Sequence, residues 1–211
     1  MAAHFGRRFL FAMTIAGLAG CAATLSENQC KANDWYTVGY SDASNGYDAS
    51  RLLQHDNACV GHGVVPDRAQ YTAGWNDGIQ AYCTPENGFN VGENGATYNR
   101  ICPANLESDF HAAYSNGRTL YVAESEVSQL ENSIDQRSAR IQEMKSEMQY
   151  AVNALVAPDT ATTDRLFLLE RTKSLSEEQG RLQSEIDRLS ADLAVKRDRV
   201  ESLRQTLAYG S

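Results

Sequence analysis

The chain has 211 residues, of which 42% are hydrophobic and 22% are charged, and its formal net charge is -8. This composition excludes a fully disordered protein, and the length allows one or two domains but not several independent cores. The acidic balance also argues against a nucleic-acid partner, because contacts to phosphates need clustered lysine and arginine side chains.

The N-terminus has the layout of a secretory signal. Arg7 and Arg8 form a positively charged start, and the apolar run Phe9 to Leu18 follows them directly. Small residues come next, and the apolar run is too short for a transmembrane helix. These features predict that the chain is exported.

The end of this signal, Leu18-Ala19-Gly20-Cys21, resembles the bacterial lipobox. The resemblance implies a signal peptide over residues 1–20, a lipid on Cys21 and a tether over residues 21–29. Ala22, where an Asp would favour the inner membrane, further implies that the anchored chain faces the periplasm from the outer membrane. The alternative is an ordinary signal peptide in which the cysteine is incidental.

Four further cysteines, Cys30, Cys59, Cys83 and Cys102, would then lie in an oxidising compartment. They allow three patterns of two disulfides. We expect Cys30–Cys59 and Cys83–Cys102, because sequential pairing links neighbouring elements most simply, and the other two patterns stay open.

Composition changes near residue 121. All four of these cysteines and both tryptophans lie before it, whereas residues 122–211 are rich in Glu, Gln, Arg, Ser and Leu. The change predicts a disulfide-stabilised helical domain over residues 30–121 and a different, elongated structure after it.

The first part repeats a pattern of aromatic, glycine or alanine, aromatic and acid or amide. The three copies read "YTVGYSDA" from Tyr36, "YTAGWNDG" from Tyr71 and "FHAAYSNG" from Phe110. Their spacing puts the aromatic residues on one helical face with a small residue between them, which permits close approach of a second helix. We therefore expect helices that cross at Gly39, Gly74 and Ala113.

The same residues suggest a second interpretation, which is an aromatic groove edged by Asp34 and further acids and suited to a sugar or a cation. Packing is the more common use of aromatics at helical spacing. The possible binding residues are Trp35, Tyr36, Tyr40, Asp42, Tyr71, Trp75, Asp77 and Tyr82.

Other patterns predict little chemistry. His55, Cys59 and His62 have a spacing that metal ligands use, but a disulfide would remove the thiolate, so we expect no metal. Residues 86–102 are rich in Asn-Gly pairs and predict a loop or short hairpin. No catalytic or phosphate-binding motif is present, and we expect neither an enzyme nor a cofactor.

Residues 122–211 carry apolar residues at alternating steps of three and four, which predicts coiled-coil helices. A turn near residues 157–163, centred on Pro158, separates the two series and favours an antiparallel hairpin within one chain. This register would place Arg137 opposite Gln179. A parallel coiled coil between chains is the alternative, so self-association stays open.

The cluster Leu166 to Leu169 lies near the expected tip of this hairpin. Only Leu168 is needed in the seam between the helices. Leu166, Phe167 and Leu169 therefore either form an exposed docking patch or pack onto the turn.

The cysteine-containing part is also similar to a family of uncharacterised bacterial lipoproteins with a domain of unknown function. The similarity rests on "CKANDWYTVGYSDASNG", "HDNACVGHGVVPDRAQYTAGWNDGIQAYCTPENGF" and "GATYNRICP" and covers about residues 30–121. At Ala43 the family usually has a glycine. The resemblance implies an envelope location and a fold, and no activity.

These observations predict a mainly α protein, with a small disulfide-linked helical domain followed by a long antiparallel coiled-coil hairpin. We expect a lipid-anchored envelope protein of the structural or interaction type, which presents the hairpin to an envelope protein or cell-wall partner. The alternative is a lipoprotein that binds a glycan or small molecule on its aromatic domain.

Overall fold

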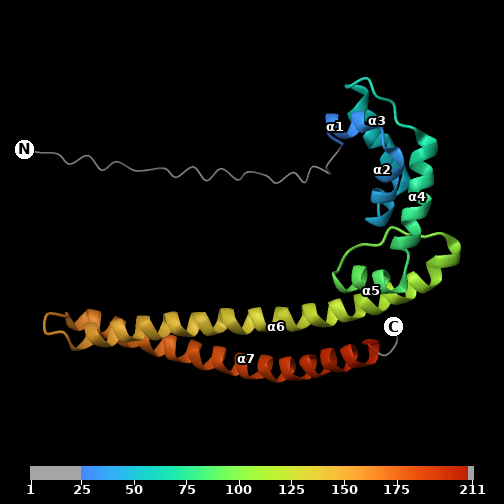
Figure 1. The fold of residues 1–211 in the computed structure, drawn as a ribbon. Coiled ribbons are helices and arrows are strands. Elements are labelled where there is room, and N and C mark those ends of the chain that lie inside the picture. The colour runs from blue at the N-terminus through green and yellow to red at the C-terminus, as the bar shows by residue number, and fades with distance from the viewer. Residues whose placement is uncertain (1–24, 209–211) are drawn as a thin grey trace, which may run out of the picture.

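The computed structural model describes residues 25–208, and every regular element within them is a helix (Figure 1). The elements are α1 (Glu27–Ala32), α2 (Trp35–Ser44), the 3₁₀ helix η1 (Ala49–Arg51), α3 (Leu52–Val60), α4 (Arg68–Tyr82), α5 (Pro85–Glu93), α6 (Ala104–Val156) and α7 (Thr162–Ala208). The predicted fold class is confirmed, since two disulfides hold the short helices and α6 and α7 form a long antiparallel hairpin.

The short helices begin at side chains that cap them. Ser26, Asp34, Asp67 and Thr84 each accept a hydrogen bond from a backbone N–H in the first turn of α1, α2, α4 and α5, respectively. Such caps satisfy N–H groups that have no partner within the helix. Asp34 is thus a cap in this fold, and the hydrogen bonds from Thr37 lower the pKa of its carboxyl.

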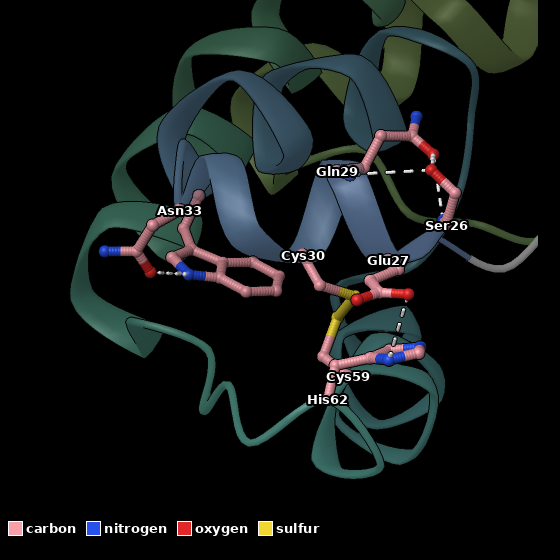
Figure 2. Close-up of a disulfide and its surroundings, with 8 residues drawn as sticks. Ser26, Glu27, Gln29, Cys30, Asn33, Cys59 and His62 are labelled. Carbon is pink, nitrogen blue, oxygen red and sulfur yellow. Dashed lines mark hydrogen bonds and ion pairs between the residues drawn. A yellow bond between two sulfur atoms is a disulfide. The ribbon is translucent and has the colours of Figure 1, made fainter.

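Both disulfides join the cysteines in sequence order, which is the pairing that we favoured. Cys30–Cys59 links α1 to the end of α3, and Cys83–Cys102 closes the segment that contains α5. Figure 2 shows the first of them below α1, beside His62, whose Nδ1 lies 3.8 Å from the Glu27 carboxylate. The two disulfides thus close residues 30–59 and residues 83–102 into two covalent loops.

The expectation of a loop or hairpin over residues 86–102 is wrong in its first half. Thr84 caps a helix there, and Pro85 occupies its first turn, where a missing N–H costs nothing. The Asn-Gly pairs suggested turns, but Gly88 and Gly92 instead let the backbone of α5 approach α6 closely. Within residues 86–102, only the stretch after α5 is irregular.

Helix α6 has 53 residues and runs through both parts of the chain. Its first turns pack on α5, and the remainder forms one arm of the hairpin (Figure 1). The composition change at residue 121 therefore lies inside one continuous helix and marks no break in the backbone.

The hairpin is held by two apolar clusters. The first lies in the outer half and contains Ile141, Met144, Leu175 and Leu182, with Met148 and Ile186 packed against them. The second lies at the base, where Leu120, Ala123 and Val200 pack with Phe89 of α5. The intramolecular antiparallel pairing is thus the one observed within residues 104–208.

The predicted register is wrong in the middle of the hairpin. Arg137 does not face Gln179 but bonds Glu185 at 2.9 Å, six residues further along α7. The turn is centred beyond Pro158, because α6 extends to Val156 and α7 begins only at Thr162. The hydrogen bond from Arg137 lowers the pKa of the Glu185 carboxyl.

We expect Leu182→Asp to open the outer half of the hairpin. Leu182 is buried in the seam, and a carboxylate there loses apolar contacts and its hydration together, which costs about 2 kcal/mol or more. Far-UV circular dichroism should show reduced helicity, whereas the near-UV signal of the disulfide-linked domain should stay. Leu166→Asp, at an exposed position of the same helix, is the control. Equal helicity in the wild-type protein and both variants would contradict the burial of Leu182 between α6 and α7.

Candidate functional site

Helices α2 and α4 approach each other more closely than side chains would allow. A Cβ atom added to Gly74 would lie 1.9 Å from the carbonyl oxygen of Tyr36, and one added to Gly39 would lie 2.1 Å from that of Tyr71. Gly78 meets Tyr40 in the same way, one turn further along both helices. The two helices therefore run parallel and cross at the glycines that the sequence pattern indicated.

Helices α5 and α6 form a second pair of the same kind. A Cβ on Gly92 would lie 2.2 Å from the carbonyl oxygen of Tyr114, and one on Gly117 would lie 2.2 Å from that of Phe89. The predicted crossing at Ala113 is therefore displaced by one turn to Gly117. The pattern aromatic-polar-x-Gly precedes each of these four crossing glycines, at Tyr36–Gly39, Tyr71–Gly74, Phe89–Gly92 and Tyr114–Gly117, and Trp75–Gly78 repeats it a fifth time.

The carboxylate of Asp42 is the centre of a buried polar cluster. It accepts a hydrogen bond of 2.8 Å from the Tyr71 hydroxyl, lies 2.8 Å from His55 Nε2 and forms an ion pair of 3.1 Å with Arg51. The Arg51 guanidinium also stacks on the ring of Tyr47. Burial, followed by the bond to Asp42, raises the pKa of Tyr71 above its ordinary value. The cluster ties α2, η1, α3 and α4 together.

The structure separates the eight possible binding residues into a core set and a surface set. Trp35, Asp42, Tyr71 and Tyr82 are buried, and Trp75 is half-buried with its indole N–H bonded to the carbonyl of Tyr47. Tyr36, Tyr40 and Asp77 are exposed. The eight residues therefore line no common groove, and only the last three face solvent together.

Tyr36 and Asp77 join α2 to α4 at the surface. The Tyr36 hydroxyl donates a hydrogen bond of 2.7 Å to the Asp77 carboxylate. This bond raises the pKa of Tyr36, since ionisation would place two negative charges side by side. Tyr40 lies one turn along α2 on the same face.

His55 and His62 each lie beside an acidic residue. Cys59 is oxidised, His55 faces Asp42 and His62 faces Glu27. No group of three or more His, Cys, Asp and Glu side chains in residues 25–208 is arranged to hold a metal ion.

Tyr98 braces the loop of the second disulfide. Its hydroxyl donates to Glu107 and accepts from the N–H of Cys102, and its ring packs on Phe110. Burial, followed by the bond to Glu107, raises the pKa of Tyr98 to about 12.

We expect the hydrogen bond between Tyr98 and Glu107 to delay the ionisation of Tyr98 in an alkaline titration, which is followed by tyrosinate absorbance. The folded protein holds the Tyr98 proton more tightly than the unfolded chain. The associated stability is therefore complete below the unfolded tyrosine pKa, about 10, and is lost as the pH rises toward 12. Tyr98→Phe should remove a late-titrating group, which the control variant Tyr150→Phe, changed at an exposed position, should retain. Identical late phases in both variants would contradict this assignment.

A groove of about 410 Å³ lies where the end of α7 meets α5 and α6. Its apolar wall contains Phe89, Leu120 and Leu207, and Arg204 lies beside them. Arg204 also bonds Glu124 of α6 at 2.7 Å. Helix α7 thus covers this face of the pair α5 and α6 with apolar side chains and with the basic residue Arg204.

The turn between α6 and α7 is held by one arginine. The Arg165 guanidinium donates to the carbonyls of Leu155, Ala157 and Thr160, and the Thr160 hydroxyl donates to the carbonyl of Ala154. These bonds satisfy backbone groups that the end of α6 leaves without a helical partner. The tip therefore has a fixed shape, which the sequence pattern did not indicate.

Large apolar side chains surround this turn and face solvent. Phe167 is 72% exposed and Val156 is 76% exposed, and Val152, Leu166 and Leu169 are also exposed. Of the two interpretations of the tip, the structure favours an exposed patch, which also includes two valines of α6. We call these five residues the tip patch.

The expected signal peptide and the expected lipidation site, Cys21, lie outside the described residues, as do residues 21–24 of the expected tether. Among the helices of residues 25–208, none contains an apolar stretch of the length that a membrane span requires.

Over residues 25–208, the fold and these sites define a helical protein with two disulfides and two helix pairs that cross at glycines, the second of which continues through α6 into a long hairpin with exposed apolar residues at its tip. Residues 34–119 match the model of a family described as a protein of unknown function, DUF2799. The matched segment runs from the cap of α2 into the first third of α6 and contains all five aromatic-polar-x-Gly sequences. No curated protein and no solved structure matches the chain.

Proposed function

We propose that this protein is anchored in a bacterial envelope membrane by a lipid on Cys21 and presents the end of its hairpin to a protein partner. The observation that carries the proposal is the tip patch on a turn fixed by Arg165. Exposed apolar clusters on ordered surfaces are typical of interaction sites. A preformed turn also lowers the entropy that a partner must remove on binding.

The length of the hairpin supports a role at a distance from the anchored domain. Helix α7 has 47 residues, which at a rise of about 1.5 Å per residue gives an arm of about 70 Å. Ion pairs between the arms, such as Arg171 with Glu147 and Lys196 with Glu126, hold them together along this length. The partner is thus met far from the disulfide-linked helices.

The alternative, a glycan or small-molecule site among the aromatic residues, has less support. Trp35, Tyr71 and Tyr82 form part of the core, and Asp42 is occupied by three partners within it. Of the eight possible binding residues, only Tyr36, Tyr40 and Asp77 are exposed.

The test is photo-crosslinking in living cells from a benzophenone amino acid at position 167, with position 195 as the matched control. Val195 is also an exposed apolar residue of α7 but lies far from the tip. We expect a discrete protein adduct from position 167 alone, and we expect Leu169→Asp to abolish it. Equal adducts from both positions, or none from position 167, would overturn tip docking.

The anchor is tested separately. The mature protein should carry acyl chains on Cys21, as measured by mass spectrometry, and Cys21→Ser should release it from the membrane fraction. An unlipidated mature N-terminus would remove the anchor from the proposal and leave the tip experiment interpretable.

A further inference from the structure

The two helix pairs can be placed in one common register. Gly39 meets Tyr71 and Trp75 as Gly92 meets Tyr114 and Arg118. Gly74 likewise meets the carbonyl of Tyr36 as Gly117 meets that of Phe89. Because these are backbone contacts at the same crossing, residues at equal offsets from the glycines occupy equivalent places on the two pairs.

This register makes Tyr36 and Asp77 the counterparts of Phe89 and Leu120. Phe89 precedes Gly92 by three residues as Tyr36 precedes Gly39, and Leu120 follows Gly117 by three residues as Asp77 follows Gly74. In the first pair, Tyr36 and Asp77 are joined by a hydrogen bond, and in the second pair, Phe89 and Leu120 belong to one apolar cluster.

The equivalent faces differ in what covers them. In the second pair, α7 packs Val200, Leu203 and Leu207 on this face, and Leu120 is only 2% exposed. In the first pair, Tyr36 and Tyr40 remain 42% and 41% exposed. Figure 1 shows that α7 runs beside α6 and ends near α5, away from α2 and α4.

We propose that the uncovered face of Tyr36, Tyr40 and Asp77 docks a helix of another protein, which carries a basic residue next to an apolar one. Helix α7 supplies the pattern, because Arg204 and Leu207 lie together on the equivalent face of the second pair. This surface goes beyond the proposed function, in which the tip patch alone meets a partner.

The chemistry of the face fits such a helix. Asp77 uses one carboxylate oxygen for the Tyr36 hydroxyl and is exposed, so an arginine or lysine can approach the carboxylate from solvent. Tyrosine rings one turn apart offer apolar surface for an aliphatic side chain and a π face for a cation. Asp77 occupies the place in the first pair that Leu120 occupies in the second. The helix that docks on the first pair should therefore be more basic than α7.

The test uses the full chain and a peptide of residues 193–208, which is stapled on its outer face so that it is helical. Binding is measured by fluorescence anisotropy against the wild-type chain, Asp77→Lys and the control Asp56→Lys, which changes an exposed acid of α3. We expect Asp77→Lys to weaken binding by at least about tenfold and Asp56→Lys to leave it nearly unchanged.

A second peptide carries Arg204→Glu. It should bind the wild-type chain poorly and recover on the Asp77→Lys chain. Recovery identifies the contact, because a peptide that merely displaces α7 from Phe89 and Leu120 would not respond to residue 77. No binding at about 1 mM, equal losses in both lysine variants or absence of recovery would each overturn the proposal.

Discussion

Gly74→Ala is expected to destabilise the first helix pair by about 3 kcal/mol or more, although alanine is the better helix former. The new Cβ would lie 1.9 Å from the carbonyl oxygen of Tyr36. The atom that it meets is backbone, so no side chain can rotate away, and α2 and α4 must separate. Separation would also weaken the buried bond between Asp42 and Tyr71, which spans the same pair.

Urea unfolding measured by tryptophan fluorescence tests this, because Trp35 and Trp75 both lie in the first pair. Gly180→Ala is the matched control, since Gly180 is also helical but has open space around its Cα atom. The control should gain up to about 1 kcal/mol from helix propensity alone. A Gly74→Ala chain as stable as the control would mean that the helices do not cross where the structure places the crossing.

Asp42→Asn is expected to cost about 3 to 5 kcal/mol at neutral pH. The substitution keeps the shape of the side chain but removes the negative charge that faces Arg51, His55 and the Tyr71 hydroxyl. Arg51 would then remain as a cation next to a neutral amide in a site that is largely closed to water.

Asp77→Asn provides the comparison. Asp77 also accepts a hydrogen bond from a tyrosine across α2 and α4, but it does so at the surface. Its loss should cost less than about 1 kcal/mol, because water replaces the missing interaction. Equal losses for the two substitutions in urea unfolding would show that the Asp42 cluster is hydrated and contributes little.

The hairpin and the disulfides could be predicted because their signals are local or few in number. Heptads with a breaker near Pro158 specify two antiparallel helices, and four cysteines allow only three pairings. The exact seam could not be predicted, because it depends on how many residues the turn uses. Arg165 bonds three carbonyls around that turn, and nothing in a heptad pattern reports these bonds.

Helix α5 shows the opposite case, in which local signals mislead. Gly88, Gly92 and the neighbouring asparagines favour turns when the segment is read alone. The same glycines stabilise a helix once α6 lies against them, because they permit a contact that larger residues would prevent. The Asp42 cluster was missed for a related reason. Its partners come from η1, α3 and α4, and no spacing in the sequence brings them together.

Because α6 is one continuous helix, a tilt at its first turns also moves its far end. Its first turns are clamped on α5 through Gly92 and Gly117, and its far end carries the turn at Ala157. At about 1.5 Å per residue, the 53 residues of α6 span about 80 Å, so a tilt of a few degrees at the clamp swings the tip by about 5 Å. A force on the tip would in turn apply torque to the crossing of α5 and α6. The Cys83–Cys102 disulfide closes the segment that contains α5 and so restrains the helix on which this torque acts.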